Sequence, residues 1–209
     1  MAREKKVKEE IDKLLYERQE QEKGKFIIAG MDEVGRGPLA GPVCVACVIM
    51  PLDDIIEGID DSKKISEKKR ELFAEQIKEK AIAYSIEMVD EQVIDQINIL
   101  EATKLCMKRA IENLTLRPDV VLVDAISKLD VNVEIRGIIK GDALSYSIGC
   151  ASILAKVTRD NYMVELSKKY PEYGFEKHKG YGTKVHIEAL KEIGPCEHHR
   201  LSFLKFLDE

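Results

Sequence analysis

The sequence has no apolar stretch long enough to span a membrane, and its first residues do not follow the pattern of a secretory signal. It also has no internal repeat and no low-complexity tract, so a repeat architecture is not indicated. With 209 residues, of which 44% are hydrophobic, the chain is long enough to bury a good core. We therefore expect one soluble, cytoplasmic domain.

Positive charge is not in excess. The 33 lysines and arginines are outnumbered by 38 aspartates and glutamates, which gives a formal net charge of -5. A general polyanion binder is therefore not expected, although local basic patches remain compatible with this balance.

Cysteine and histidine are scarce, and neither is spaced to bind a metal. The five cysteines lie mostly in apolar runs, which predicts buried, reduced thiols and not disulfides. Cys44 and Cys47 are three residues apart in an expected strand, so their side chains point to opposite faces and a shared ion is not expected. The histidines are interpreted as surface or structural residues: His178, His186, His198 and His199.

Hydrophobic periodicity divides most of the chain into alternating strands and helices. Ser66 is a suitable N-cap for one of these helices, and the longest helix carries small residues that permit close packing on a sheet. The interleaved order predicts one mixed α/β domain. We expect strands over 25–31, 43–50, 81–89, 118–126 and 132–139, and helices over 67–80, 97–114 and 145–170.

The two ends of the chain differ from this central region. Residues 2–24 are highly charged, and apolar residues recur there at helical spacing, which predicts an amphipathic helix. The apolar positions are Val7, Ile11, Leu14 and Leu15, and Gly24 can end the helix. We interpret residues 1–24 as an appendage, 25–170 as the main domain, and 171–209 as a basic, glycine-bearing extension with some helix.

Four carboxylates stand at or beside expected strand ends: Asp32, Glu33, Asp124 and Asp142. Carboxylates in apolar surroundings are costly to desolvate, and several that converge repel one another unless a cation binds. Oxygen ligands without matching nitrogen ligands favour Mg²⁺ or Mn²⁺ over Zn²⁺. Two such ions about 4 Å apart are the usual apparatus of phosphodiester hydrolysis. The alternative is that each acid only caps a helix or forms a turn.

The adjacent pair of acids poses a geometric difficulty. Neighbouring strand residues point to opposite faces, so Asp32 and Glu33 can reach one site only if the strand ends or bulges there. Gly30 and Gly35 permit such an interruption.

Six segments occur in an order that resembles a known family: GMDEVGRGPLAGPV, DSKKIS, VLVDA, KGD, ASILAKVTRD and HKGYGTKVH. Over residues 25–205 the chain is similar to ribonuclease HII, the bacterial type 2 ribonuclease H. The resemblance implies a ribonuclease H-like fold, which is a mixed β-sheet flanked by helices with a helical C-terminal extension. It also implies a metal-dependent endoribonuclease. The implied substrates are the RNA strand of RNA–DNA hybrids and single ribonucleotides embedded in duplex DNA.

The resemblance also implies the roles of individual residues. The catalytic, metal-binding acids would be Asp32, Glu33, Asp124 and Asp142, holding two Mg²⁺ or Mn²⁺ ions during catalysis. The turn of Gly35, Arg36 and Gly37 would sense the ribose 2′-OH and the adjoining phosphate, and Tyr181 would stack on the sugar next to the scissile bond. Cleavage would fall 5′ of the ribonucleotide and leave 3′-hydroxyl and 5′-phosphate ends.

The chemistry of these residues agrees with the implied roles. A glycine-flanked backbone can approach a sugar closely, and the 2′-OH is the group that separates RNA from DNA at one nucleotide. The alternative for Arg36 is a surface charge or a structural ion pair. The alternative for Tyr181 is a packing role only.

Further basic residues suit contacts with the nucleic-acid backbone, which takes half or more of such contacts. One group is Ser62, Lys63 and Lys64, for which a solvated turn is the alternative. The other is Lys177, Lys179 and Lys184, which surround Tyr181.

Two more aspartates need an interpretation. Asp61 is a rival acid that the family pattern does not make a ligand. Asp160 lies on an expected helix and is interpreted as a structural hydrogen-bond or ion-pair partner, with an indirect catalytic role as the alternative.

Two other functions compete with a ribonuclease: a DNA-cleaving metal nuclease of the same fold, and a non-catalytic hybrid-binding module. The complete set of acids argues against the second. The final residues, SFLKFLDE, form no convincing clamp-binding tail, so we expect a monomer.

Overall fold

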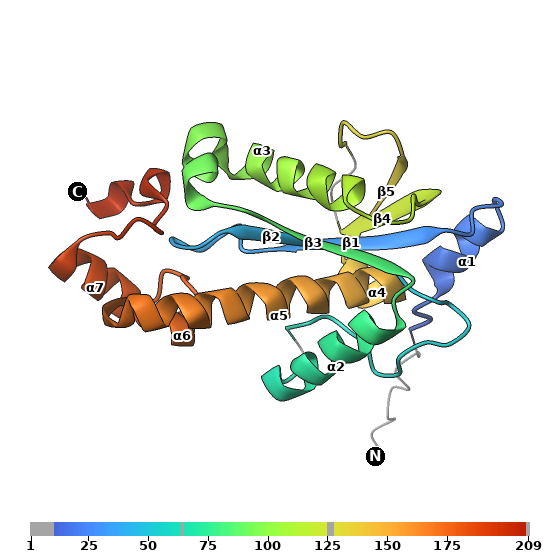
Figure 1. Cartoon of the computed structure of the whole chain (residues 1–209), viewed down its shortest axis with the longest axis horizontal. Helices are drawn as coiled ribbons and strands as arrows, with labels where there is room; N and C mark the ends of the chain where they lie inside the picture. The colour runs from blue at the N-terminus through green and yellow to red at the C-terminus, as the bar shows by residue number, and fades with distance from the viewer. Residues whose placement is uncertain (1–10, 64, 125–127, 208–209) are drawn as a thin grey trace, which may run out of the picture.

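The computed structural model describes residues 11–63, 65–124 and 128–207. Its centre is a sheet with the strand order β3-β2-β1-β4-β5 (Figure 1). Strand β1 pairs antiparallel with β2 and parallel with β4, which confirms the predicted mixed sheet. The strands are β1 (Ile28–Val34), β2 (Val43–Ile49), β3 (Ala83–Val89), β4 (Val120–Asp124) and β5 (Glu134–Ile138).

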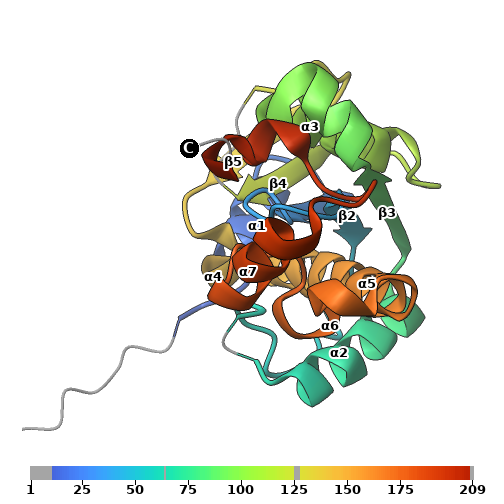
Figure 2. The ribbon, with the colours of Figure 1, turned by 90° about the vertical axis from the view of Figure 1, so that its left-hand side faces the viewer.

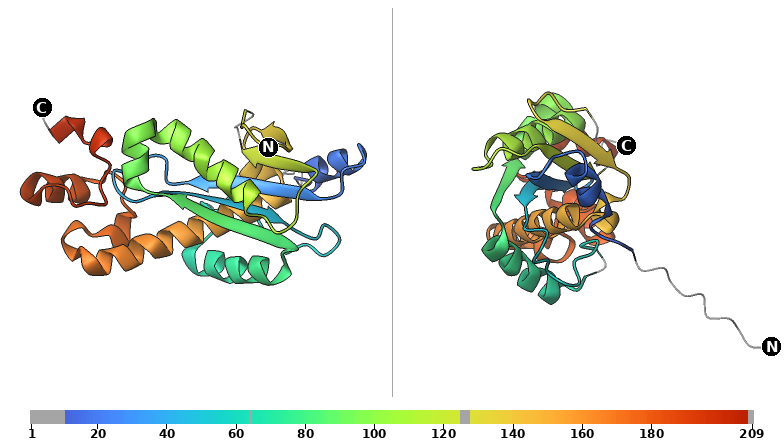
Figure 3. Two further views of the ribbon diagram at one scale, coloured as in Figure 1. Left: turned by 45° about the horizontal axis from the view of Figure 1, so that its top comes forward. Right: turned by 90° about the vertical axis from the view of Figure 1, so that its right-hand side faces the viewer.

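Helices cover both faces of this sheet. Helix α3 (Glu91–Glu112) lies on one face, and α5 (Tyr146–Lys169) runs along the other with α2 (Glu67–Lys80) packed against it (Figures 1 and 3). Alternate side chains of β2 therefore enter two cores. Cys44 packs on the α5 side and Cys47 on the α3 side, as the spacing predicted.

A glycine sets the closest approach between α5 and the sheet. A Cβ atom at Gly30 would lie 2.1 Å from the carbonyl carbon of Ser147, so no other residue fits at this position of β1. The first half of α5 is buried nearly throughout, which confirms the role predicted for its small residues.

The C-terminal extension gathers at one end of the sheet (Figure 2). It is tied to the loop between β1 and β2 by main-chain hydrogen bonds from Leu39 to Gly180 and from Arg200 to Leu39, both 2.8 Å long. Its elements are η1 (Pro171–Tyr173), α6 (Phe175–His178), α7 (Lys184–Ile193), η2 (Leu201–Phe203) and η3 (Lys205–Leu207).

Some predicted boundaries are wrong. Strand β1 begins later than predicted and continues to Val34, because β2 pairs with it without interruption as far as Cys44. Helix α3 begins at Glu91, since the Asp90 side chain accepts a hydrogen bond from the first turn, and it is kinked at Asn98.

The predicted N-terminal helix is also wrong in extent. Helix α1 spans only Leu15–Gln21, so Ile11 and Leu14 precede it, and Val7 lies outside the described residues. Two glutamates of α1, Glu17 and Glu20, are completely buried. Buried charges, and not an apolar stripe alone, therefore hold this helix in place.

Glu17 and Glu20 make different contacts. The Glu17 carboxylate accepts hydrogen bonds from the Ser145 hydroxyl (2.6 Å) and the Ser147 amide (3.0 Å) at the N-terminus of α5. Glu20 pairs with two lysines and with Arg136 of β5. Burial alone would raise the pKa of Glu20, but the hydrogen bonds from these cations outweigh it and lower the pKa to about 2.

We predict that Glu17→Gln lowers the free energy of unfolding by about 1–3 kcal/mol, because a buried, charge-assisted cap of α5 is weakened. Urea unfolding at neutral pH measures this change. Glu22→Gln is the matched control, since Glu22 lies exposed just after the same helix. Equal stability of the two variants would show that Glu17 does not anchor α1.

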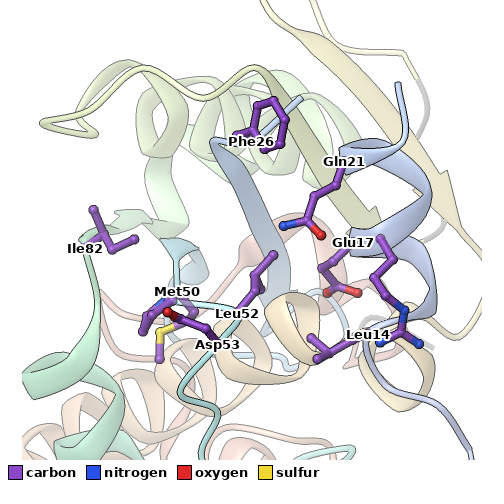
Figure 4. A pocket seen from close by; sticks show the side chains of 10 residues that line it. Leu14, Glu17, Gln21, Phe26, Met50, Leu52, Asp53 and Ile82 are labelled. Atoms are coloured by element: carbon purple, nitrogen blue, oxygen red, sulfur yellow. The ribbon is translucent and has the colours of Figure 1, made fainter. Parts of the chain in front are cut away.

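A pocket of about 550 Å³ lies between α1 and the ends of β1 and β2 (Figure 4). Phe26, Leu52 and Ile82 are among its lining residues, and no predicted catalytic residue lines it. Among the described residues, no helix is long and apolar enough to cross a membrane.

Candidate active site

The sheet topology brings Asp32 and Asp124 side by side. Strands β1 and β4 are parallel neighbours with Met31 opposite Val123, so the next residue of each strand is an aspartate. Strand β4 ends at Asp124, whereas β1 continues to Val34. Among the described residues, the edge of β1 facing β4 is therefore unpaired beyond Met31. This gap in the sheet lets the side chains of Asp32 and Glu33, which leave the strand on opposite faces, both approach Asp124.

The third aspartate comes from the loop after β5. Asp142 lies in the first turn of α4 (Gly141–Leu144), which follows Lys140 in a left-handed conformation. The amide of Gly141 donates a 3.1 Å hydrogen bond to the carboxylate of Asp124. This contact fixes the turn that carries Asp142 against the end of β4.

The electrostatics of the acids reflect their proximity. Burial and the adjacent Glu33 carboxylate raise the pKa of Asp32 well above its usual range, and Asp124 adds to this effect. Burial also raises the pKa of Glu33 and of Asp142, with further contributions from Asp124. The acids thus form one interacting group in which each charge disfavours the others.

The Glu33 side chain shows that the acids lack partners for their negative charge. One carboxylate oxygen lies 3.5 Å from Arg36, and the other is buried with no hydrogen-bond partner among the described residues. Within the same part of the chain, no three acidic, histidine or cysteine side chains converge tightly enough to hold an ion as they stand. The carboxylates are gathered but repel one another, which fits a site that a divalent cation completes.

The turn after β1 presents its backbone to this region. Gly35 is buried with φ +94°, and a Cβ there would lie 2.3 Å from the Arg159 side chain, so the position requires glycine. Arg36 and Gly37 are exposed. Because Arg36 pairs with Glu33, its structural alternative has direct support.

Two buried arginines donate hydrogen bonds to the main-chain carbonyls of this turn and of the loop that follows it. Arg200, in the C-terminal extension, donates hydrogen bonds to the main-chain carbonyls of Gly35 (2.6 Å), Arg36 (3.0 Å) and Gly41 (2.6 and 2.9 Å). Burial and the neighbouring Arg159 lower the pKa of Arg200 to about 9, so it remains cationic at neutral pH.

Arg159 of α5 makes the second set of contacts. It donates to the carbonyls of Pro42 (2.9 Å), Ala40 (3.1 Å) and Lys179 (2.9 Å), and so joins the β1–β2 loop to the loop that carries Tyr181.

Tyr181 lies against the glycine turn. Its side chain is 42% exposed, and a Cβ at Gly37 would lie 3.8 Å from its ring. The structure therefore brings the two predicted substrate-binding elements together, although they are separated by more than 140 residues in the sequence.

The DSKK segment lies on the other side of the acids. Ser62 is buried, and its hydroxyl lies 3.0 Å from that of Ser152 on α5. Ser152 offsets part of the rise in the pKa of Asp32, so the two serines lie beside this acid. Lys63 is exposed and Asp61 half-buried, and both lie near Asp142. The predicted Lys64 lies outside the described residues.

The remaining predicted residues lie outside this group. Asp160 forms a 2.8 Å ion pair with Lys156 one turn away on α5, as its structural interpretation predicted. Lys177 and Lys184 are exposed, and each pairs loosely with a glutamate, whereas Lys179 is half-buried.

Sequence reasoning missed Ser152, Arg159 and Arg200. All three are buried polar residues inside or beside helices, where a serine or arginine usually faces solvent. Their partners are main-chain carbonyls or another buried hydroxyl. No local pattern in the sequence signals such contacts.

Comparisons with known proteins identify the family and the fold. The family model described as Ribonuclease HII matches residues 29–206. The ribonuclease HII of Caldicellulosiruptor bescii is 62% identical over 182 residues, which cover 87% of this chain and 88% of that protein. The ribonuclease HII of Archaeoglobus fulgidus, solved in complex with PCNA, superposes with a TM-score of 0.76 at 28% identity, covering 88% of this chain and 97% of the other.

A more distant structure shares the fold alone. Bst-RNase HIII, solved in complex with Mn²⁺, superposes with a TM-score of 0.71 at 19% identity, covering 85% of this chain and 67% of that one. The predicted ribonuclease H-like fold is confirmed. The family model and these relatives show that this chain belongs to the ribonuclease HII family, whose activity is cleavage of the RNA of RNA–DNA hybrids and of embedded ribonucleotides.

Proposed function

We propose that Asp32, Glu33, Asp124 and Asp142 are the catalytic acids and that they hold two divalent cations, Mg²⁺ or Mn²⁺. The observation that carries this proposal is the meeting of Asp32 and Asp124 on adjacent parallel strands, beside a buried Glu33 oxygen that has no partner among the described residues. The oxygen-only donor set suits these hard cations. The Mn²⁺ bound by the distant Bst-RNase HIII is consistent with it.

When bound, the cations polarise the scissile phosphate and activate the attacking water in a phosphodiester hydrolysis. The residues of the chain supply the positions. The buried Ser152 lies beside Asp32 and offsets part of the rise in its pKa, and the Gly141 amide orients Asp124. Lys63, close to Asp142, adds a positive charge where a phosphate would approach.

Recognition of the ribonucleotide rests on the glycine turn and Tyr181. The main chain of Gly35, Arg36 and Gly37 would bind the 2′-OH and the adjoining phosphate. The carbonyls of Gly35 and Arg36 already accept hydrogen bonds from Arg200, which holds the turn in place for this contact. Tyr181 would pack on the next sugar, where a second 2′-OH would crowd the ring. The preferred substrate is then a ribonucleotide followed by a deoxyribonucleotide, cut on its 5′ side to leave 3′-hydroxyl and 5′-phosphate ends.

A pair of substrates tests this assignment: a DNA duplex with one embedded ribonucleotide, and a duplex with one continuous RNA strand. We expect the wild type to prefer the first in Mg²⁺ or Mn²⁺, and to lose activity on both in excess chelator. Tyr181→Ala should lower the rate and reduce the preference between the substrates, with metal affinity unchanged. Lys191→Ala, which removes an exposed side chain near the end of α7 with no predicted substrate role, is the control.

Several outcomes would contradict the assignment. Full turnover in chelator would exclude the metal mechanism. An unchanged preference in Tyr181→Ala would remove Tyr181 from the substrate site. Equal cleavage of an all-DNA duplex would favour the competing DNA-nuclease function.

A further inference from the structure

Two histidines outside the carboxylate group touch each other in the interior of the C-terminal extension. His186, in the first turn of α7, and His199, before η2, are buried, with their Nε2 atoms 3.0 Å apart. Two nitrogens at this distance share one proton, because two N–H groups would face each other and two bare lone pairs would repel.

The outer nitrogens of the pair decide which histidine carries that proton. The Nδ1 atom of His186 lies 3.0 Å from the main-chain oxygen of Tyr181, and a carbonyl can only accept, so His186 carries its proton on Nδ1. The Nδ1 atom of His199 lies 3.0 Å from the Cys196 amide nitrogen and 3.3 Å from the Cys196 carbonyl oxygen. Because Nε2 of His186 is left as an acceptor, His199 carries its proton on Nε2, and its Nδ1 atom accepts from the Cys196 amide. The shared bond therefore runs from His199 to His186.

The result is one directed chain of hydrogen bonds, from the Cys196 amide through His199 and His186 to the carbonyl of Tyr181. Both rings are neutral in this arrangement. Burial, the main cause, lowers the pKa of His186, and burial together with the neighbouring His186 lowers the pKa of His199 to about 4.

A third histidine holds the residue before Tyr181. The Nε2 atom of His178 lies 2.8 Å from the carbonyl of Tyr173, and its Nδ1 atom accepts a 3.2 Å hydrogen bond from the Gly180 amide. Its ring stacks on that of His186, with centroids 4.5 Å apart. Histidine side chains thus fix the main chain at Gly180 and Tyr181, while the tyrosine side chain remains exposed.

We propose that His186 and His199 are positioning residues that fix the main chain of Tyr181 and thereby aim its ring at the sugar beside the cleaved bond. This inference rests on the substrate role proposed for Tyr181. A side chain that must discriminate one hydroxyl needs a rigid base, since small displacements of a contacting group weaken discrimination.

Two substitutions of His186 separate its two hydrogen bonds. His186→Asn keeps an amide donor at the position of Nδ1 and retains the bond to Tyr181. His186→Gln places its amide near the position of Nε2, retains contact with His199 and loses the bond to Tyr181. We expect His186→Gln to reduce the preference for the single-ribonucleotide duplex over the continuous RNA strand by about fivefold, the effect of one hydrogen bond. His186→Asn should retain most of the wild-type preference for the single-ribonucleotide duplex.

The control is His198→Gln, next to His199 but outside the chain of hydrogen bonds. It should leave the preference unchanged. Long-range proton–nitrogen NMR spectra of the wild type should show His186 protonated on Nδ1 alone and His199 on Nε2 alone at pH 7. An imidazolium at either position would overturn the proposal.

Tyr181→Ala, measured beside these variants, separates this inference from the proposed function. If Tyr181→Ala loses the preference while folded His186→Gln keeps it, the histidine pair does not position Tyr181, and the tyrosine's role stands. If neither variant changes the preference, both assignments are wrong. If both reduce it and His186→Asn restores it, both are supported.

Discussion

Asp32→Asn is expected to reduce turnover by at least about 100-fold while the protein remains folded. The substitution removes one anionic ligand from the proposed metal site, and losing a single charge-stabilising group from an active site commonly has this scale of effect. Steady-state cleavage of the single-ribonucleotide duplex at saturating Mg²⁺ measures the loss. Asp124→Asn and Asp142→Asn should behave in the same way.

The same substitution should raise stability in the absence of metal. The folded-state pKa of Asp32 lies above its unfolded value because of burial and Glu33. Above the unfolded pKa, the charged form therefore opposes folding, and replacing it with a neutral amide removes this cost. Urea unfolding at pH 7 in chelator should show Asp32→Asn to be more stable than the wild type, and the difference should shrink as pH falls.

Asp160→Asn provides the comparison. Asp160 is paired with Lys156 on α5, so its substitution should change stability more than turnover. A folded Asp160→Asn without activity would move this residue into the site. An Asp32→Asn variant with nearly the wild-type rate would show that Asp32 is not a ligand.

Arg200→Lys should have the largest effect among the residues that sequence reasoning missed. Lysine keeps the charge but cannot reproduce the fork of donors that reaches the carbonyls of Gly35, Arg36 and Gly41. Loss of two or more charge-assisted bonds should lower the free energy of unfolding by about 3 kcal/mol or more. Because the glycine turn would then shift, kcat/KM on the single-ribonucleotide duplex should fall about 100-fold.

Arg109→Lys, at an exposed position of α3, is the control and should leave both quantities unchanged. Urea unfolding and steady-state kinetics together decide the matter. If Arg200→Lys unfolds like the wild type and retains kcat/KM, the buried guanidinium does not support the turn.

The sequence was sufficient for the parts of the molecule that local pattern controls. Helix α2 begins and ends where predicted, because its residues favour a helix; Ser66 occupies the N-cap position, but its side chain makes no capping hydrogen bond. The strand before Asp124 and the small residues of α5 were also recognised from their periodicity and size. Periodicity alone put the four acids at or beside strand ends. The family resemblance then implied that they form one metal-binding site.

The errors arose where tertiary contacts override the local pattern. The strand predicted over 25–31 ends too early, since its apolar run stops at Met31 while β1 pairs with β2 as far as Val34. The two adjacent acids were expected to share one site only if this strand ended or bulged there. In the structure the interruption belongs to β4, whose end opens the edge of β1. Glu17 and Glu20 were not singled out within the charged segment 2–24, since nothing nearby in the sequence reveals partners such as Ser145 and Arg136.

The docking of α1 onto α5 has a consequence for how the protein forms during synthesis. Glu17 meets Ser147, which is translated 130 residues later, and Ile28 of β1 pairs with Val120 of β4, which is translated 92 residues later. At about 5–20 residues per second, this delay is on the order of ten seconds. Helix α1 is therefore among the last of the described elements to find its partner, and β1, which can pair early with β2, spends this interval with the N–H and C=O groups of its other edge unpaired.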